Sequence, residues 1–470
     1  AWADETGTAF YVAVLEKDVP GAGGYEEIYP SLLTTSQGPP PLDDPAIAPL
    51  PNGGALFFGG INADGPSYPT YELHGSVWSQ TYSIVNPLPR ARHAIARDAR
   101  RANNVMFGGV DHAGTVLDDT WTYRDGTWTF RAVQNRPSAR TDHSIGWDPN
   151  LGVCILFGGK DASGATLGDM WRWNGSAWTR LTPSVLPPAR HSHQTALDPR
   201  RGRLVLCGGE RDGVLLNDAW EWDGTAWTEV TPAQPNWRPD PVADFGMDYD
   251  PRSERIVLYG GNTSSGCSAE FWSWDGSQWV LSYSDGAMPS ARHGHHMFFD
   301  VAQNELRLYG GGCGGSSTDE LWKIDLPVQH RYAQFGVGCQ GTIGVPALAA
   351  DPATQPVLGQ PFKVDLTGIP GSPANIPFII IGFSKTEWAG GALPLDLGII
   401  GMPGCQLLTS SEEVRTVANL AGRASISFVI PQQTTLLGVS TFLQGAVTDR
   451  FANLQGLIVS NGVEIFIGDR

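Results

Sequence analysis

The chain has 470 residues, a length that allows two to four domains. It combines 58 Gly and 35 Pro with 17 Trp, and only 17% of its residues are charged. This composition favours many short strands joined by turns and excludes a helical bundle, a coiled coil and a disordered acidic tail. The net charge of −17, without a basic run, argues against nucleic acid and anionic membranes as partners. No apolar stretch is long enough for a helix that spans a bilayer.

The N-terminal segment, residues 1–20, contains one apolar run, Ala9 to Leu15, which predicts a strand. We expect this strand to join the C-terminal domain or the edge of a repeat sheet; the alternative is that it pairs with a neighbouring molecule, as a donor strand does. The chain begins at Ala1 and lacks a charged and apolar leader. We therefore expect a mature, exported chain, already cleaved from its signal peptide and located outside the cell or at its surface.

Six copies of an apolar strand that ends in Gly-Gly follow, at intervals of 49 to 52 residues. In five copies an Asp lies ten residues before the first glycine, and in three of them Pro follows, which is typical of a hairpin turn. An aromatic residue follows each Gly-Gly, and in five copies a Trp comes seven residues later, usually after an Asx-Gly turn. Each copy therefore predicts four short strands, which bury both faces only when the sheets pack radially. The first glycines are Gly59, Gly108, Gly158, Gly208, Gly260 and Gly310.

This pattern resembles the kelch repeat over about residues 21–327. The resemblance implies a six-bladed β-propeller. The sixth copy stops after Leu321 to Ile324, without its last strand. Because kelch propellers commonly close their ring by strand exchange, we expect Tyr25 to Leu33 to supply the missing strand.

The second domain, residues 328–470, shows alternating apolar runs separated by Gly and Pro, which predict an antiparallel β-sandwich. Its segments Phe335 to Gly341 and Gly401 to Cys405 resemble a C-terminal module of large secreted bacterial proteins. The expected fold class is therefore all-β: a six-bladed kelch-type propeller followed by a sandwich.

Six cysteines in an exported chain suggest disulfides. Cys339 and Cys405 are the two in the second domain, and we expect them to pair. Cys267 and Cys313 follow the Gly-Gly of copies five and six and are predicted to bridge neighbouring loops. The other two, Cys154 and Cys207, lie within strands and are interpreted as small buried apolar residues.

The motif Arg-x-x-His precedes four of the six copies. One reading is that its histidines surround a metal ion; the other is that Arg and His hold the backbone of neighbouring strands. Repetition favours the structural reading, because a catalytic site needs each group once. We expect neither a metal nor a cofactor. The motif comprises Arg90/His93, Arg140/His143, Arg190/His193 and Arg292/His295.

Copies one and five depart from this motif, and they flank copy six in the expected ring. Copy five has Val242 and Phe245 at the Arg and His positions, and copy one is aligned there with Pro41 and Asp44. We hypothesise an acidic, aromatic-lined pocket at copies five, six and one that binds a sugar or a cation. The alternative is that these residues are ordinary loop acids of an acidic protein. The candidate ligand-binding residues are Asp44, Trp237, Asp240, Asp244 and His295.

The function that we predict is non-catalytic binding of glycan or protein through the loop face of the propeller, at the cell surface or in extracellular matrix. One alternative is a self-assembling subunit of an extracellular filament or layer, joined through Ala9 to Leu15 or the sandwich edge. A second alternative is a secreted carbohydrate-active hydrolase or oxidase. The sequence contains no Gly-x-Ser-x-Gly, His-Glu-x-x-His or phosphate-loop motif, which argues against the enzyme.

Overall fold

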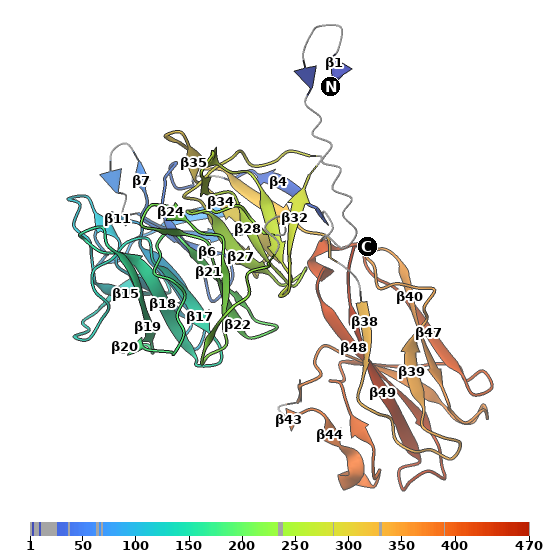
Figure 1. Cartoon of the computed structure of the whole chain (residues 1–470). Helices are drawn as coiled ribbons and strands as arrows, with labels where there is room; N and C mark the ends of the chain where they lie inside the picture. The colour runs from blue at the N-terminus through green and yellow to red at the C-terminus, as the bar shows by residue number, and fades with distance from the viewer. Residues whose placement is uncertain are drawn as a thin grey trace.

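A computed structural model describes residues 2–3, 9–10, 26–35, 38–62, 65–66, 69–233, 238–284, 286–328, 331–389 and 391–469. Within these ranges the fold is all-β, as predicted, with two short 3-10 turns, η2 (Leu397–Ile400) and η3 (Thr434–Leu436). A ring of sheets and a separate C-terminal region, drawn in orange and red, make up the molecule (Figure 1). In the described part of the chain, no helix is long and apolar enough to cross a membrane.

The repeat region forms six sheets in chain order, each of four or five strands. Their strands are, from sheet one to sheet six: β5 (Ala46–Pro49), β6 (Ala55–Phe58), β9 (Thr70–His74) and β10 (Val77–Thr81); β12 (Ala94–Asp98), β13 (Asn103–Phe107), β15 (Thr120–Arg124) and β16 (Thr127–Arg131); β17 (Ser144–Asp148), β18 (Val153–Lys160), β19 (Thr166–Trp173) and β20 (Trp178–Leu181); β21 (Gln194–Asp198), β22 (Arg203–Cys207), β25 (Ala219–Trp222) and β26 (Trp227–Glu229); β27 (Gly246–Asp250), β28 (Arg255–Tyr259), β31 (Phe271–Trp274) and β32 (Trp279–Tyr283); β33 (His296–Asp300), β34 (Glu305–Tyr309) and β37 (Leu321–Asp325).

The first strands of the six sheets contact one another in turn, β5 to β12, β17, β21, β27 and β33, and β33 returns to β5. Apolar residues of adjacent sheets share one core at each junction; Phe58 of sheet one and Trp128 of sheet two belong to the same cluster. The indole nitrogen of Trp128 also donates to Thr70 Oγ1 (2.9 Å), and Trp178 makes the same bond to Thr120 one sheet later. The repeated Trp residues therefore join each sheet to the preceding one.

The segment before the first copy pairs with two different sheets. Strand β4 (Tyr29–Leu33) lies antiparallel to β37 and is the fourth strand of sheet six. Strand β3 (Glu26–Glu27) lies parallel to β32, at the edge of sheet five. The chain thus links sheets five and six before it enters sheet one. Of the predicted N-terminal strand, Ala9–Phe10 (β2) pairs with β1 (Trp2–Ala3), and residues 11–15 lie outside the described residues.

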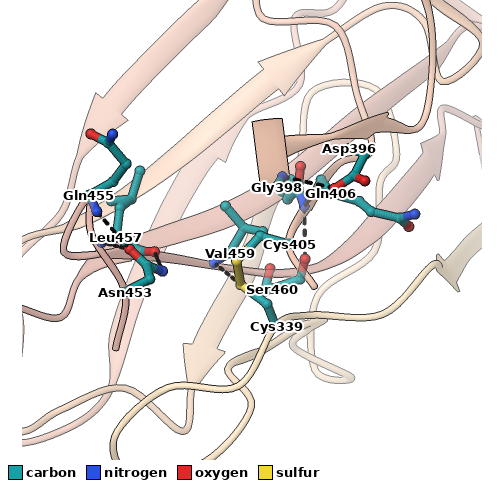
Figure 2. Close-up of a disulfide and its surroundings, with 11 residues drawn as sticks. Cys339, Asp396, Gly398, Cys405, Gln406, Asn453, Gln455, Leu457, Val459 and Ser460 are labelled. Atoms are coloured by element: carbon teal, nitrogen blue, oxygen red, sulfur yellow. Dashed lines mark hydrogen bonds between the residues drawn. A yellow bond between two sulfur atoms is a disulfide. The ribbon is translucent and has the colours of Figure 1, made fainter. Parts of the chain in front are cut away.

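The C-terminal region contains a five-stranded and a three-stranded sheet that share one apolar core. Between β41 and β46 the chain leaves the larger sheet, and the disulfide Cys339–Cys405 anchors this excursion beside Val459 (Figure 2). In sheet order the strands are β38 (Arg331–Phe335), β49 (Leu457–Phe466), β48 (Ser440–Thr448), β41 (Pro377–Gly382) and β46 (Glu413–Thr416), then β39 (Ala347–Ala350), β40 (Pro361–Thr367) and β47 (Ala424–Val429); the excursion carries β42 (Glu387–Trp388), β43 (Gly391–Ala392), β44 (Leu395–Asp396) and β45 (Gln406–Leu407).

The C-terminal region contacts the turns that follow the first strands of sheets five and six. Asn304 Nδ2 donates to the carbonyl oxygens of Thr435 (3.3 Å) and Leu437 (3.1 Å). Gly438 has φ +74°, and a Cβ added there would lie 2.4 Å from the Cα of Arg252, so the two backbones touch. These turns lie at the opposite end of the ring from the Gly-Gly segments.

Candidate functional site

The arginines of the repeated motif are buried and hold their own sheets together. Arg140 Nη1 donates to the Gly158 carbonyl (2.9 Å) and to Asp169 Oδ1 (2.7 Å), and its Nη2 donates to Asp169 Oδ2 (3.0 Å). Burial alone would raise the pKa of Asp169, but the Arg140 guanidinium holds that pKa below its usual value. The same latch recurs in four sheets: Arg90–Asp119, Arg140–Asp169, Arg190–Asp218 and Arg292–Glu320.

The histidines of the motif are buried against the preceding sheet. His143 lies edge-on to Phe107 of the preceding sheet, with ring centroids 5.7 Å apart. Burial lowers the pKa of His143 to about 3, so its ring is neutral at pH 7. No group of three His, Cys, Asp or Glu side chains in the described ranges is placed to hold a metal ion. Arg and His of the motif therefore act on the frame of the ring.

The residue directly before the motif His, together with its equivalent in sheets one and five, forms what we call the mouth ring. Its members are Asp44, Arg92, Asp142, Ser192, Asp244 and Gly294. All six have left-handed backbones, with φ between 51° and 65°. The N–H of each donates to the carbonyl of the preceding one, and Asp44 N–H donates to Gly294, so six bonds of 2.8–3.3 Å close a circle. Asp tolerates this conformation better than most residues, whereas Arg and Ser are unusual in it. The circle fixes six side-chain positions around the axis of the ring.

The charges on the mouth ring do not balance. It carries three carboxylates and one guanidinium; Arg92 Nε lies 3.1 Å from Asp44 Oδ2 and 3.9 Å from Asp142 Oδ1. Burial, reinforced by the carboxylates of Asp44 and Asp142, raises the pKa of Asp244 to about 7. Burial also raises the pKa of Asp142. Among the described residues Arg92 pairs with Asp44 and Asp142, whereas Asp244 has no ion pair and accepts a hydrogen bond from the Ser192 hydroxyl.

Below the mouth ring, a cavity of about 450 Å³ runs between the first strands of the six sheets. Its wall is mainly apolar, although Arg97, Gln194, Thr195 and Asp248 also line it. At the far end the wall includes Trp147, Tyr249 and Phe299. The aliphatic part is formed by Ile47, Ile95, Ile145, Met247 and Met297. An acidic mouth therefore leads into an apolar channel.

Of the predicted site residues, the structure brings Asp44, Asp244 and His295 together on this channel. Asp240 is exposed and does not line it. Trp237 lies outside the described residues. Sequence reasoning missed Arg92 and Asp142; the available signal was their shared place between Arg and His of the motif.

The alignment of copy one at Pro41 and Asp44 was wrong by one position. Leu42 and Pro45 occupy the Arg and His positions, and Asp44 belongs to the mouth ring. The cause is the first hairpin of sheet one: Asp44 lies 15 residues before Gly59, whereas Asp142 lies 16 before Gly158.

Hairpins that follow the Gly-Gly segments surround the mouth ring, and two of them are linked covalently. The predicted disulfide Cys267–Cys313 joins β29–β30 (Asn262–Thr263, Gly266–Cys267) to β35–β36 (Gly312–Cys313, Ser316–Ser317). Both predicted cysteine pairs are present, and Cys154 and Cys207 are buried and free. The other hairpins are β7–β8 (Ile61–Asn62, Gly65–Pro66), β14 (Val110–Asp111), which pairs with β11 (Arg90–Ala91), and β23–β24 (Glu210–Arg211, Val214–Leu215).

The connection from sheet one to the mouth ring exposes apolar side chains. It runs over residues 82–89, between β10 and Arg90. Tyr82 is 83% exposed and Ile84 is fully exposed, and more than half of Leu88 is also accessible to solvent. Such grouped apolar side chains mark interaction surfaces more often than single ones do.

Comparison with known proteins assigns the repeat. Residues 48–236 match the family model of the KLHDC2/KLHL20/DRC7 Kelch-repeats domain. The predicted kelch repeat is confirmed for this range.

The curated relative that matches is similar to a shorter part of the chain than the family model is. The tRNA wybutosine-synthesizing protein 4 of Emericella nidulans is 35% identical over 80 residues, 16% of this chain and 8% of that protein. The chain thus spans only a small fraction of this relative. The solved structure described as "Structure of YjhT" aligns at 15% identity and a TM-score of 0.49, covering 63% of this chain and 97% of that one.

Proposed function

We propose that this chain is a non-catalytic binding protein that recognises a protein partner through the mouth end of a six-bladed kelch propeller. In this proposal the C-terminal region is a β-sandwich that supports the propeller, and the protein acts outside the cell or at its surface. The mouth ring carries the proposal: a repeated backbone circle presents three Asp, one Arg, one Ser and one Gly at equivalent positions. Frame residues such as the arginine latches recur from sheet to sheet, whereas a recognition surface needs different groups at each position.

The two ends of the propeller differ in what remains accessible. Turns of sheets five and six at the far end already contact Thr435, Leu437 and Gly438 of the C-terminal region. The mouth end carries the Gly-Gly hairpins, the acidic ring and the exposed loop 82–89. This asymmetry supports the mouth end as the recognition face.

A protein partner is favoured over a glycan for two reasons. The matched family consists of kelch repeats, and kelch domains generally bind protein partners. The exposed side chains of Tyr82, Ile84 and Leu88 also offer an apolar area that suits a protein surface. The two disulfides are compatible with an oxidising location.

The test compares capture by three forms of the immobilised full chain from an extracellular protein fraction. We expect partners that the wild-type chain retains to be lost from Ile84→Asp, because a charge at this position opposes apolar contact. The matched control is Leu420→Asp, at a residue of the C-terminal region that is 72% exposed. Equal capture by all three forms, or no specific capture by the wild type, would contradict the proposal.

A further inference from the structure

We infer that the mouth ring and its channel bind a small organic cation, a protonated amine or guanidinium carried on an apolar stem. This inference goes beyond the proposed function, because it assigns a small-molecule ligand to the mouth ring and its channel. Three features carry it: the unbalanced carboxylates, the apolar channel beneath them and buried polar atoms that have no partner.

The carboxylates set the sign of the ligand. Asp44 and Asp142 approach the one guanidinium of the ring, Arg92, from both sides. Asp244 shares the ring with them and forms no ion pair among the described residues, although the Ser192 hydroxyl donates to it and Arg92 attracts it at longer range. Asp244 is partly exposed at the mouth, close to the carboxylates of Asp44 and Asp142, so a cation that enters beside it gains a charge-assisted bond and relieves repulsion. An anionic ligand would meet three carboxylates instead.

The channel sets the shape of the ligand. Its volume of about 450 Å³ lies in the range of small-molecule sites, and it begins at the level of the carboxylates. Ile95, Ile145 and Met247 form part of its wall. Apolar walls below a charged mouth suit a head group with an aliphatic or aromatic stem, because the stem leaves water while the charge stays at the acids.

Four buried histidines of the lining, His93, His143, His193 and His295, have an Nδ1 without a hydrogen-bond partner in the described part of the chain. His193 and His295 line the cavity and are only 2% and 1% exposed. In these two rings Nε2 lies within hydrogen-bond distance of other groups, Ser144 Oγ for His193 and both Gly246 N and Tyr259 O for His295. Buried polar atoms of native proteins are rarely left unsatisfied. These nitrogens are independent of the carboxylates and are consistent with a polar guest in the cavity.

The experiment uses three six-carbon probes that differ only in their head group: hexylammonium, hexan-1-ol and hexanoate. Binding to the full chain is measured by titration calorimetry and NMR at pH 8. We expect hexylammonium to bind at least about tenfold more tightly than hexan-1-ol, and hexanoate not to bind. Asp244→Asn should weaken hexylammonium binding about tenfold. Asp240→Asn, an exposed acid outside the channel, is the matched control and should leave binding unchanged.

Each other result overturns the inference. Equal affinities of the ammonium and the alcohol would show that charge has no role. Equal losses in Asp244→Asn and Asp240→Asn would show diffuse attraction to an acidic protein. Absence of binding by every probe would show that the channel takes no such stem. The proposed function is judged separately, because the probes are measured without a partner protein: capture that Ile84→Asp abolishes would retain the binding face even if no probe binds.

Discussion

Sheets one and five differ from the other four in the position that holds the arginine latch. Sheets two, three, four and six place a buried Arg there, and sheets one and five place buried Leu42 and Val242. The backbone is the same in both classes: the N–H of Val242 donates to Leu216 O (3.0 Å), as that of Arg140 does to Leu117 O (3.1 Å). The comparison teaches that the latch reinforces a frame that glycines and turns already define.

In the mouth ring the backbone is constant and the side chains vary, whereas the arginine latch repeats the same side chain in four sheets. Its six backbone bonds close in sheets with and without the latch. Its side chains nevertheless change from acid to base to hydroxyl to none around the circle. Under the proposed function, these varying side chains would serve recognition, whereas the constant frame serves folding.

The largest expected effect comes from removing one latch in a sheet that has it. Arg140→Ala should destabilise the protein by about 3–5 kcal/mol, because Asp169 and the Gly158 carbonyl lose their donor at a buried position. The double variant Arg140→Leu/Asp169→Leu, which adopts the apolar side chain that sheet one has at the latch position, should lose clearly less. Urea unfolding of the full chain measures both. A double variant as unstable as the single one would show that the two classes of sheet are not interchangeable.

Much of this frame was predictable from spacing. The interval of Gly-Gly, the Asx-Gly turns and the Trp positions predicted an all-β kelch repeat, and the loop positions of Cys267 and Cys313 predicted their pairing. Gly159 shows why the twin glycines recur: its φ is +106°, and a Cβ there would lie 2.7 Å from the Thr141 carbonyl oxygen. Such constraints are local, so they appear in the sequence.

The mouth ring was only partly predictable. Its members share a backbone conformation and not a residue type, so no pattern of identities marks them. Arg92 and Asp142 lie within the Arg-x-x-His motif, which was interpreted only through its Arg and its His. Asp44 was named but placed at the wrong position, because sheet one has a hairpin one residue shorter. Charge proximity across sheets, as between Arg92 and Asp44, depends on closure of the ring, which spacing along one chain does not encode.

A smaller effect, of opposite sign, is expected at the mouth ring. The pKa of Asp244 is raised to about 7 by burial and by Asp44 and Asp142, so ionising it opposes folding. The folded protein is not destabilised by Asp244 below pH about 4, where this group is protonated in both states. As pH rises from about 4, the pKa in the unfolded chain, to about 7, the pKa in the folded protein, the wild type loses stability. Asp244→Asn should therefore be more stable than the wild type at pH 8, by at most about 4 kcal/mol, since one pKa unit is about 1.4 kcal/mol. The gain should vanish near pH 4.

The control is the difference between wild type and variant at each pH, because other groups titrate in both proteins. Arg92 and His296 also lie on the channel and remain in the variant. Thermal unfolding of wild type, Asp244→Asn and Asp240→Asn at pH 4, 6 and 8 gives the profile. A constant difference across this range would mean that Asp244 does not titrate as its surroundings indicate.

The smallest effect is expected at the far end, where the contact with the C-terminal region depends on shape more than on charge. Arg331 donates to both carboxylate oxygens of Glu254 (2.7 and 2.6 Å) and lies 3.9 Å from the centre of the Phe466 ring. Because these groups are partly exposed, Arg331→Ala should cost only about 1 kcal/mol. Gly438→Ala should cost more, since its Cβ would meet the Arg252 backbone. If Arg331→Ala had the larger effect in thermal unfolding, charge would hold this end as well, and the contrast with the mouth ring would fail.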